Sequence, residues 1–259
     1  MTAVAKAGPG TAQRVTTLLT HLADAGGPVT IRQMSDGLGL APSTTHRLLN
    51  LLVEEGFVSH DDRSATYAAG PEFLRVAHRI VAATSPADAA HGVIADLAAR
   101  YDETVLFGLL LRPAGRIAFV ARADGQKKLL YRIEMNTPLS LVWGASGKAA
   151  LAHMPQQEIT GILAREGASP ASGAAVPDAA ALDAELARIR ADGYGISHGE
   201  KLPEALGIAA PVFGPGGVIG SICMTMPNDR APALPPERLG AEVAQAAADF
   251  SARLGGQTP

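Results

Sequence analysis

Cysteine is almost absent from this chain of 259 residues, and its single thiol, at Cys223, limits the chemistry that the protein can carry. One cysteine cannot form a disulfide within the chain, and it cannot supply the clustered thiolates of zinc or iron–sulfur sites. The seven histidines are scattered, and none stands at ligand spacing from a carboxylate or a second imidazole. The sequence therefore predicts no metal site and no cofactor.

Long apolar runs are missing as well. No stretch approaches the roughly 18 to 20 consecutive apolar residues that span a bilayer, and residues 1–10 lack a charged segment followed by an apolar block. The net charge of −3 argues against a nonspecific nucleic-acid coat and against a membrane-surface binder. We therefore expect a cytoplasmic protein with no membrane partner. Its hydrophobic content of 47% can bury the cores of two ordinary domains.

The clearest functional pattern lies in residues 42–55. Pro42 suits a first helical position, because proline has no amide proton and its φ is preset, and Gly56 suits the end of the helix. At about 100° per residue, one face of this helix gathers inward-facing residues, namely Thr45, Leu48, Leu49 and Leu52. The other face gathers hydrogen-bonding side chains, namely Ser43, His46, Arg47 and Asn50. Hydroxyl, amide and guanidinium groups of this kind suit phosphates and base edges in a DNA groove.

The flanking segments are typical of a winged helix-turn-helix. Thr30 and Gln33 have the spacing of a capping box at the start of a preceding helix, and residues 38–42 supply a turn that contains glycine. After Gly56, residues 57–60 predict a strand, residues 61–64 a turn, and residues 65–67 a returning strand. The sequence predicts that this hairpin is the wing.

The predicted partner of this unit is double-stranded operator DNA. The expected contact residues come from the cap, the second helix and the wing: Thr30, Ser43, Thr44, His46, Arg47, Asn50 and Arg63. Residues 1–85 hold seven basic and seven acidic side chains, so the unit is neutral, whereas most duplex binders carry a basic patch. We therefore expect two copies on one DNA site, each making several weak contacts. A three-helix packing unit with a hairpin and no DNA partner is the alternative.

The remaining pattern predicts a second domain after a connector. Residues 1–10 resemble a tail, residues 11–70 form the winged unit, residues 71–85 a linker helix, and residues 86–259 the second domain. Strands are expected at 104–111, 116–121, 128–133, 195–198, 207–213 and 218–225. Helices are expected at 86–101, 146–153, 155–165, from Leu182 to Gly193, and at 235–254, with 167–176 as a surface loop. This order predicts an α+β fold with a mostly antiparallel sheet flanked by helices.

Four segments in this order resemble the IclR family of bacterial transcription regulators. They are Ala41–Leu49, Leu139–Leu141 leading into Gly144–Ala149, Gly193–Glu200 and Ile208–Phe213. The resemblance runs from about Gln13 to Leu254. It implies a winged helix-turn-helix, a linker helix and a GAF-like C-terminal domain that binds a small organic acid effector. It also implies a homodimer or a dimer of dimers, in which the effector shifts affinity for DNA.

The resemblance also implies where the effector binds. The family's pocket maps here to Gly144, Ala145, Ser146, Ser197, Gly207, Cys223 and Thr225. Small residues let backbone amides approach a ligand, and amides near a helix start favour an anion. Relatives that bind small keto acids usually carry an acid at the position of Ser197, a cysteine at Gly207 and a hydroxyl at Cys223. We therefore expect a less polar pocket, with Trp143 as a wall, that binds an apolar or aromatic carboxylate.

Two other functions remain open: a DNA-binding dimer whose pocket is unused, and an enzyme acting on a small carboxylic acid. The enzyme has little support, because Ser197 and His198 are neighbours on a strand and point to opposite faces. No catalytic residues are assigned. Lys148 follows Gly147, but the spacing of a phosphate-binding loop is absent, so structural pairing is preferred for it. Cys223 is expected to be a buried, inert thiol.

Overall fold

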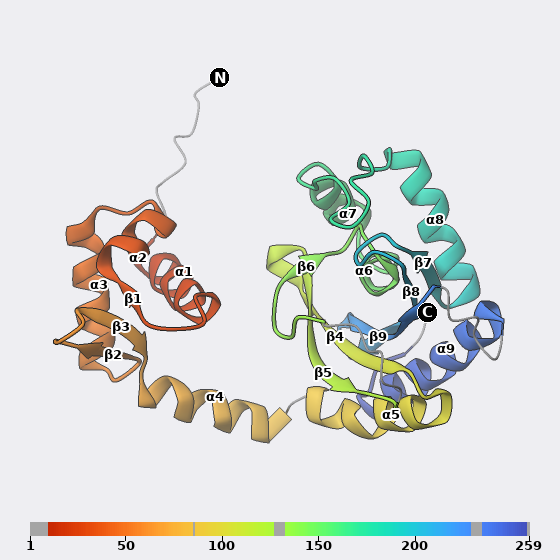
Figure 1. Cartoon of the computed structure of the whole chain (residues 1–259), viewed down its shortest axis with the longest axis horizontal. Helices are drawn as coiled ribbons and strands as arrows, with labels where there is room; N and C mark the ends of the chain where they lie inside the picture. The colour runs from red at the N-terminus through yellow and green to blue at the C-terminus, as the bar shows by residue number, and fades with distance from the viewer. Residues whose placement is uncertain (1–9, 85, 127–132, 229–234, 258–259) are drawn as a thin grey trace. The chain divides into compact units, whose positions relative to one another are not determined.

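The computed structural model describes residues 10–84, 86–126, 133–228 and 235–257 (Figure 1). It divides into two compact units, Met1–Ser85 and Pro86–Pro259. Of the expected N-terminal tail, only Gly10 lies within the described residues. The strand expected at 128–133 also lies outside them, except for Ile133, which is not in a strand. Within the described part of the chain, no helix combines the length and the apolarity that a bilayer crossing requires.

The N-terminal unit consists of helices and a small antiparallel sheet. Its elements are α1 (Thr11–Asp24), β1 (Val29–Thr30), α2 (Ile31–Leu38), α3 (Pro42–Glu54), β2 (Val58–Asp61), β3 (Thr66–Ala69) and α4 (Pro71–Thr84). The sheet has the order β1-β3-β2, so the expected hairpin of β2 and β3 gains a short third strand that the sequence did not reveal. Leu18, Met34, Leu48 and Leu49 are its most buried hydrophobic side chains among the described residues, and they join three helices into one core.

Local chemistry fixes where the helices of this unit begin and end. The expected capping box at α2 is present: the Gln33 amide donates to the Thr30 hydroxyl, and the Thr30 amide donates to the Gln33 side chain. Gly39 ends α2 in the left-handed region, with φ of 62°, and Gly56 adopts φ of 72° just after α3. Glycine has no Cβ to oppose this conformation, so the turn between α2 and α3 follows from the sequence.

The C-terminal unit is built on a six-stranded sheet in the order β6-β5-β4-β9-β8-β7, with every pair antiparallel. Its strands are β4 (Thr104–Leu111), β5 (Arg116–Ala123), β6 (Leu139–Ser140), β7 (Gly195–His198), β8 (Ala205–Gly214) and β9 (Gly217–Pro227). Its helices are α5 (Pro86–Tyr101), the 3-10 turn η1 (Arg112–Ala114), α6 (Ala145–Leu151), α7 (Gln156–Leu163), α8 (Ala179–Asp192) and α9 (Pro236–Arg253). The expected α+β class is confirmed.

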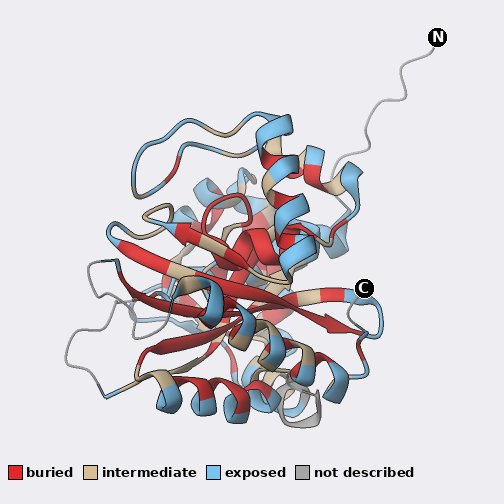
Figure 2. Ribbon diagram, turned by 90° about the vertical axis from the view of Figure 1, so that its right-hand side faces the viewer, coloured by how far each residue is buried: buried red, intermediate tan, exposed pale blue. Residues whose placement is uncertain are grey.

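The two faces of this sheet form separate cores. Helices α5 and α9 lie against one face, where Phe107 and Phe250 meet edge to face at 5.5 Å between ring centroids. Helix α6 lies against the other face, with α7 and α8 farther out (Figure 1). The strands are buried on both sides, while the outer surfaces of the helices are exposed (Figure 2). On this second face a cavity lies beside α6.

Candidate functional site

Helix α3 separates its side chains as the sequence predicts. Thr45 and Leu49 are fully buried, and the Thr45 hydroxyl donates to the carbonyl of Ala41 within the helix. The predicted contact residues lie on the other side. Four of them are exposed, namely Ser43, His46, Arg47 and Asn50, and Thr44 is half-buried. The helix therefore presents a row of donors that the unit's own packing does not use.

Guanidinium groups in this unit differ in whether a carboxylate already holds them. Arg75 makes two hydrogen bonds to Glu72 within α4, the shorter at 2.5 Å, and Arg32 lies 3.8 Å from Asp36. Arg47 on α3 and Arg63 at the wing have no such partner among the residues that the structure describes, and both are exposed. Arg14 on α1 and Arg79 on α4 likewise have no carboxylate partner among these residues, so unpaired guanidinium groups are not confined to the elements that the sequence assigns to DNA.

The wing is held by contacts of its own. Asp61 accepts the Ser64 hydroxyl at 2.7 Å and the Arg63 amide at 3.0 Å, and these bonds lower the pKa of Asp61. The ring of His60 stacks on Tyr67 across the hairpin, with 4.4 Å between centroids. These contacts order the turn, so the Arg63 side chain projects from a fixed backbone.

Thr30, which the sequence analysis placed in the DNA-contact set, uses its hydroxyl within the unit itself. Its hydroxyl proton goes to the Gln33 carboxamide oxygen at 2.9 Å, and its backbone amide goes to the same atom. A hydroxyl has one proton to donate, so Thr30 cannot donate to a phosphate while this cap is intact. Thr30 begins a helix, and the DNA-contact proposal proceeds without it.

The second candidate site is a cavity of about 360 Å³ beside α6. Seven of the eight predicted effector residues line it: Gly144, Ala145, Ser146, Ser197, Gly207, Cys223 and Thr225. Sequence analysis missed the remaining wall residues, namely Phe119, Ile133, Glu134, Leu139, Pro170, Glu200, Lys201, Leu202 and Ala205. These come from β5, β6, the start of β8 and three loops, and no local pattern connects them.

Strand register brings the predicted pocket residues together. Ser197 on β7 lies opposite Gly207 on β8, which lies opposite Thr225 on β9. A Cβ atom added at Gly207 would stand 3.0 Å from the Ser197 Oγ and 3.6 Å from the Ala145 Cβ. Because Gly207 has no side chain, the space that a side chain would fill belongs to the cavity.

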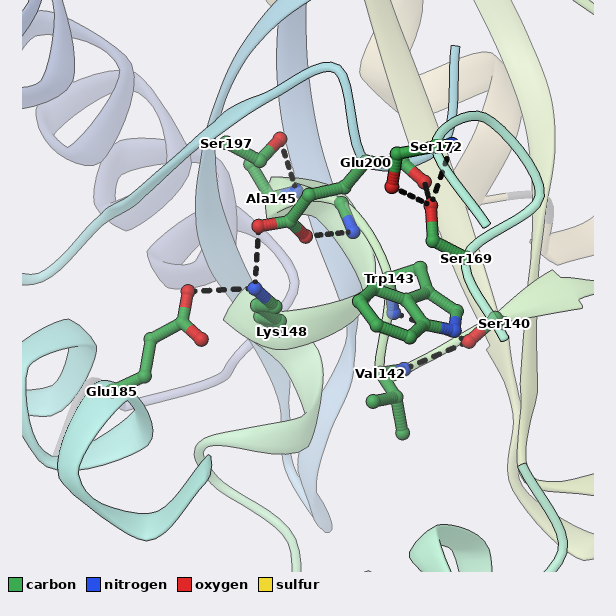
Figure 3. Close-up of polar contacts among 11 residues, drawn as sticks. Ser140, Val142, Trp143, Ala145, Lys148, Ser169, Ser172, Glu185, Ser197 and Glu200 are labelled. Carbon is green, nitrogen blue, oxygen red and sulfur yellow. Dashed lines mark hydrogen bonds and ion pairs between the residues drawn. The ribbon is translucent and has the colours of Figure 1, made fainter. Parts of the chain in front are cut away.

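Backbone amides at the start of α6 were expected to favour an anion, and the chain supplies their acceptors itself. The Gly144 amide donates to the Glu200 carboxylate at 2.8 Å, and the Ala145 amide donates to the Ser197 hydroxyl at 2.9 Å (Figure 3). Gly144 has φ of 83°, and a Cβ there would stand 3.3 Å from the Lys201 side chain. A ligand therefore does not find these two amides free.

Glu200 also belongs to a buried ion-pair network. Lys148, only 4% exposed, donates from Nζ to Glu185 at 2.7 Å and to Glu200 at 2.8 Å (Figure 3). The network joins α6, α8 and the loop after β7, and one of its members, Glu200, also lines the cavity. The structural pairing expected for Lys148 is present.

Lys201 points the other way, toward the cavity. Its Nζ donates to the Ser140 carbonyl at 3.2 Å and to the Ser146 hydroxyl at 3.4 Å. Burial lowers the pKa of Lys201 to about 8, an effect that the charges of Cys223, Glu200 and Glu166 partly oppose. The cavity therefore holds a basic group that the sequence analysis did not identify. The only signal for Lys201 was its place directly after the family-like segment that ends at Glu200.

The expectation that Trp143 forms a wall of the cavity is wrong. Its indole is buried among the residues of α6, α7 and α8, and its Nε1 donates to the Gly167 carbonyl at 2.9 Å. Trp143 does not line the cavity. It anchors the loop at 167–176 instead, and Ser169 of that loop donates to the Glu200 carbonyl at 2.7 Å. Trp143 thus supports the pocket wall containing Pro170 without touching the space inside.

The remaining groups that the sequence analysis considered as reactive are Cys223, Ser197 and His198. The Cys223 thiol is buried 3.7 Å from the Thr225 hydroxyl, and burial raises the pKa of that thiol. Ser197 is buried on the cavity side, while His198 is exposed and its Nδ1 lies 2.9 Å from the Asn228 Oδ1. Over the described ranges, no three metal-binding side chains come together.

Comparison with protein families gives two matches that together span most of the chain. A model described as the IclR helix-turn-helix domain matches residues 11–62. A model described as bacterial transcriptional regulator IclR C-terminal matches residues 78–252. The chain is also 27% identical over 185 residues to the HTH-type transcriptional regulator BhcR of Paracoccus denitrificans. That match covers 71% of this chain and 66% of that protein.

Solved structures agree with this match. A crystal structure of an IclR transcriptional regulator from Silicibacter sp. TM1040 has a TM-score of 0.86 at 26% identity, and the alignment covers 96% of this chain and 98% of that one. An IclR homolog from Microbacterium hydrocarbonoxydans, complexed with 4-hydroxybenzoate, has a TM-score of 0.74 at 21% identity. That alignment covers 93% of this chain and 98% of the other. At 21% identity the second likeness concerns the fold alone.

Proposed function

The chain belongs to the IclR family of bacterial transcriptional regulators, and on this premise we propose that α3 and the wing contact operator DNA while the C-terminal cavity binds the effector. The proposed contacts are Ser43, Thr44, His46, Arg47 and Asn50 on α3, and Arg63 at the wing. Two copies of the chain read two half-sites, because each neutral unit can neutralise few phosphates. Effector binding changes how the two winged units are held, and so couples ligand to operator.

The observation that carries this proposal is the division of α3 into a buried and an exposed face. Leucines hold the helix to the unit, whereas Arg47 and its neighbours have no internal partner among the described residues. A planar guanidinium can donate to guanine or phosphate in bidentate fashion. An arginine on the outer face of a helix-turn-helix is therefore well suited to the major groove.

The test begins with sheared genomic DNA from the source bacterium, from which the full-length protein captures its sites. Affinity for the recovered fragment is then measured by fluorescence anisotropy. We expect the double variant Ser43→Ala, Arg47→Ala to bind at least about 1000-fold more weakly, since each base or phosphate contact contributes roughly 1–3 kcal/mol and two contacts are lost in each of two subunits. The dependence of affinity on salt should also become shallower.

Arg75→Ala is the matched control, because its guanidinium is already held by Glu72 on α4. It should bind the fragment within a few-fold of the parent. Unchanged binding by the double variant would show that α3 does not contact DNA through this face, and the three-helix packing unit without a DNA partner would then replace the proposal.

For the effector, we propose a small organic acid with an apolar or aromatic body. The walls at Phe119, Ile133 and Leu139 are apolar, and Gly207 keeps the space open. The homolog complexed with 4-hydroxybenzoate illustrates that a protein of this fold is compatible with an aromatic acid. Calorimetry across a panel of carboxylates tests the class: binding of two- and three-carbon acids alone would contradict it.

The same panel distinguishes the competing functions. A ligand that favours the native state raises the melting temperature by mass action, and a regulator's ligand also changes operator affinity. No thermal response to any acid would favour a DNA-binding dimer with an unused pocket. Chemical conversion of a bound acid during incubation, followed by chromatography, would favour an enzyme.

A further inference from the structure

The polar groups around the cavity are paired in a way that leaves one positive charge unbalanced. Glu200, the sequence neighbour of Lys201, gives its carboxylate to Lys148 and to the Gly144 amide. The Lys201 ammonium contacts only neutral oxygens, those of Ser140 and Ser146. Within the described ranges, no carboxylate forms an ion pair with it.

The ammonium group also has an unused proton. Two of its three protons go to the Ser140 carbonyl and the Ser146 hydroxyl, which leaves the third without an acceptor among the described residues, and Lys201 itself lines the cavity. Much of the surrounding wall is apolar, from Phe119, Ile133 and Leu202. Holding a charge in such surroundings opposes folding unless an anion completes the pair. A ligand carboxylate would supply both the acceptor and the opposite charge.

We propose that Lys201 is the carboxylate anchor of the cavity and that the effector is a monocarboxylate with an apolar body. This inference rests on the proposed effector function and adds the residue that recognises the ligand. The apolar body lies against Phe119, Ile133 and Leu139, in a space at the lower end of typical ligand pockets. Glu134 also lines the cavity, so a second carboxylate on the ligand meets a like charge.

Anchoring by Lys201 makes binding dependent on protons. The groups that act on Lys201 are Cys223 on β9, Glu200 in the same loop, Glu166 after α7 and Lys148 on α6, and Glu134 shares the cavity wall. The pKa of Lys201 is about 8, and a bound carboxylate would raise that pKa. Binding near pH 8 therefore takes up protons, and affinity falls as the pH rises through 8.

The experiment is titration calorimetry of the full-length protein at pH 8, with benzoate as the probe and benzamide as its neutral counterpart. The titration is repeated in phosphate and in Tris, whose different ionisation enthalpies reveal proton uptake. We expect benzoate to bind at least tenfold more tightly than benzamide and benzene-1,3-dicarboxylate, with uptake of a fraction of a proton. In Lys201→Met, benzoate should lose tenfold or more in affinity, benzamide should change little, and proton uptake should vanish.

Arg188→Gln is the matched control, because it removes one positive charge from the same unit at an exposed position on α8. It should bind benzoate as the parent does. The fold of Lys201→Met is checked by thermal unfolding, which should show no loss of stability below pH 8, since the variant removes a half-buried charge from largely apolar surroundings. From pH 8 to 10.5 the parent alone should gain stability, because its unfolded state holds the Lys201 proton longer.

Benzoate binding by Lys201→Met at the parent's affinity would overturn the anchor. So would binding without proton uptake, or a parent that binds none of benzoate, 4-hydroxybenzoate and hexanoate. Operator affinity of the parent, measured in the same preparation, tests the proposed regulatory function separately. A parent that binds benzoate through Lys201 but captures no DNA would retain the anchor and contradict the regulator.

Discussion

The polar side chains on the outer face of α3 and those beside α6 differ in whether they have hydrogen-bonding partners within the protein. On α3, exposed groups such as Arg47 and Asn50 have no internal partner among the described residues. Beside α6, Lys148 and Glu200 are committed to one another and to Gly144. The first arrangement suits the large external partner that we propose for α3, and the second leaves Lys201 for the small ligand that we propose for the cavity.

This difference predicts how each region responds to substitution. Exposed side chains without internal partners contribute little to folding, so changing them should alter binding and leave stability within about 0.5 kcal/mol. Buried groups that satisfy one another cannot be removed singly without leaving a partner unpaired. Substitutions on the outer face of α3 should therefore change binding without changing stability, whereas substitutions beside α6 should change both.

Removal of Lys148 should have the largest effect on stability. Lys148→Met leaves the carboxylates of Glu185 and Glu200 facing one another without their shared cation, and both are about a quarter exposed, at 26% and 25%. We expect a loss of about 3 kcal/mol in the free energy of unfolding, at the lower end for a broken buried pair. Denaturant unfolding followed by fluorescence of Trp143, the only tryptophan, reports directly on this unit.

An exposed ion pair in the same unit gives the control. Arg100 lies 3.1 Å from Glu242, with side chains 58% and 38% exposed. Arg100→Met should therefore cost less than about 1 kcal/mol. Equal losses for Lys148→Met and Arg100→Met would mean that burial does not distinguish the two pairs, and the contrast between buried and exposed groups would fail.

Filling the cavity should have the next largest effect, and it should act mainly on the ligand. Gly207→Val places a branched side chain beside the Ser197 Oγ and the Ala145 Cβ, in the space that Gly207 leaves open. We expect at least a tenfold loss of affinity for benzoate in calorimetry, with a cost of about 2 kcal/mol in stability from overpacking.

Gly214→Val is the control for this change, because Gly214 lies on the same strand and does not line the cavity. A Cβ there meets a side-chain atom of Ile219 at 3.1 Å, so it also strains local packing. It should lower stability and leave benzoate affinity unchanged. If Gly214→Val weakened benzoate as strongly as Gly207→Val, the loss would reflect general distortion of the sheet.

The fold of both units was largely predictable because their elements follow local rules. Strand β4, helix α5 and strand β7 have the predicted bounds, since hydrophobic patterns and breakers such as Pro86 mark their ends. The face of α3 followed from helical periodicity alone. The short strands β1 and β6 did not, because two residues carry no periodicity and their pairing depends on distant partners.

The cavity was only partly predictable, for the same physical reason. Ser197, Gly207 and Thr225 were placed by resemblance, and strand register then brings them side by side. Neither family resemblance nor local pattern predicted the positions of Lys201 and Trp143. Nothing in the sequence near Lys201 indicates that this loop lysine lines a cavity. Nothing near Trp143 indicates that its side chain packs away from the cavity and bonds to Gly167.

Substitution of Thr30 should have the smallest effect on stability, and it tests where the proposed DNA-contacting surface ends. Thr30→Ala removes the hydroxyl that caps α2, so the opening free energy of the α2 amides should fall by about 1 kcal/mol in hydrogen exchange. Operator affinity at low temperature should stay within twofold of the parent, because Thr30 donates its proton to Gln33. Thr16→Ala on α1, where the hydroxyl bonds only within the helix, should leave both quantities unchanged. A loss of operator affinity in Thr30→Ala comparable to that of Arg47→Ala would return Thr30 to the contact surface and extend that surface from α3 to the start of α2.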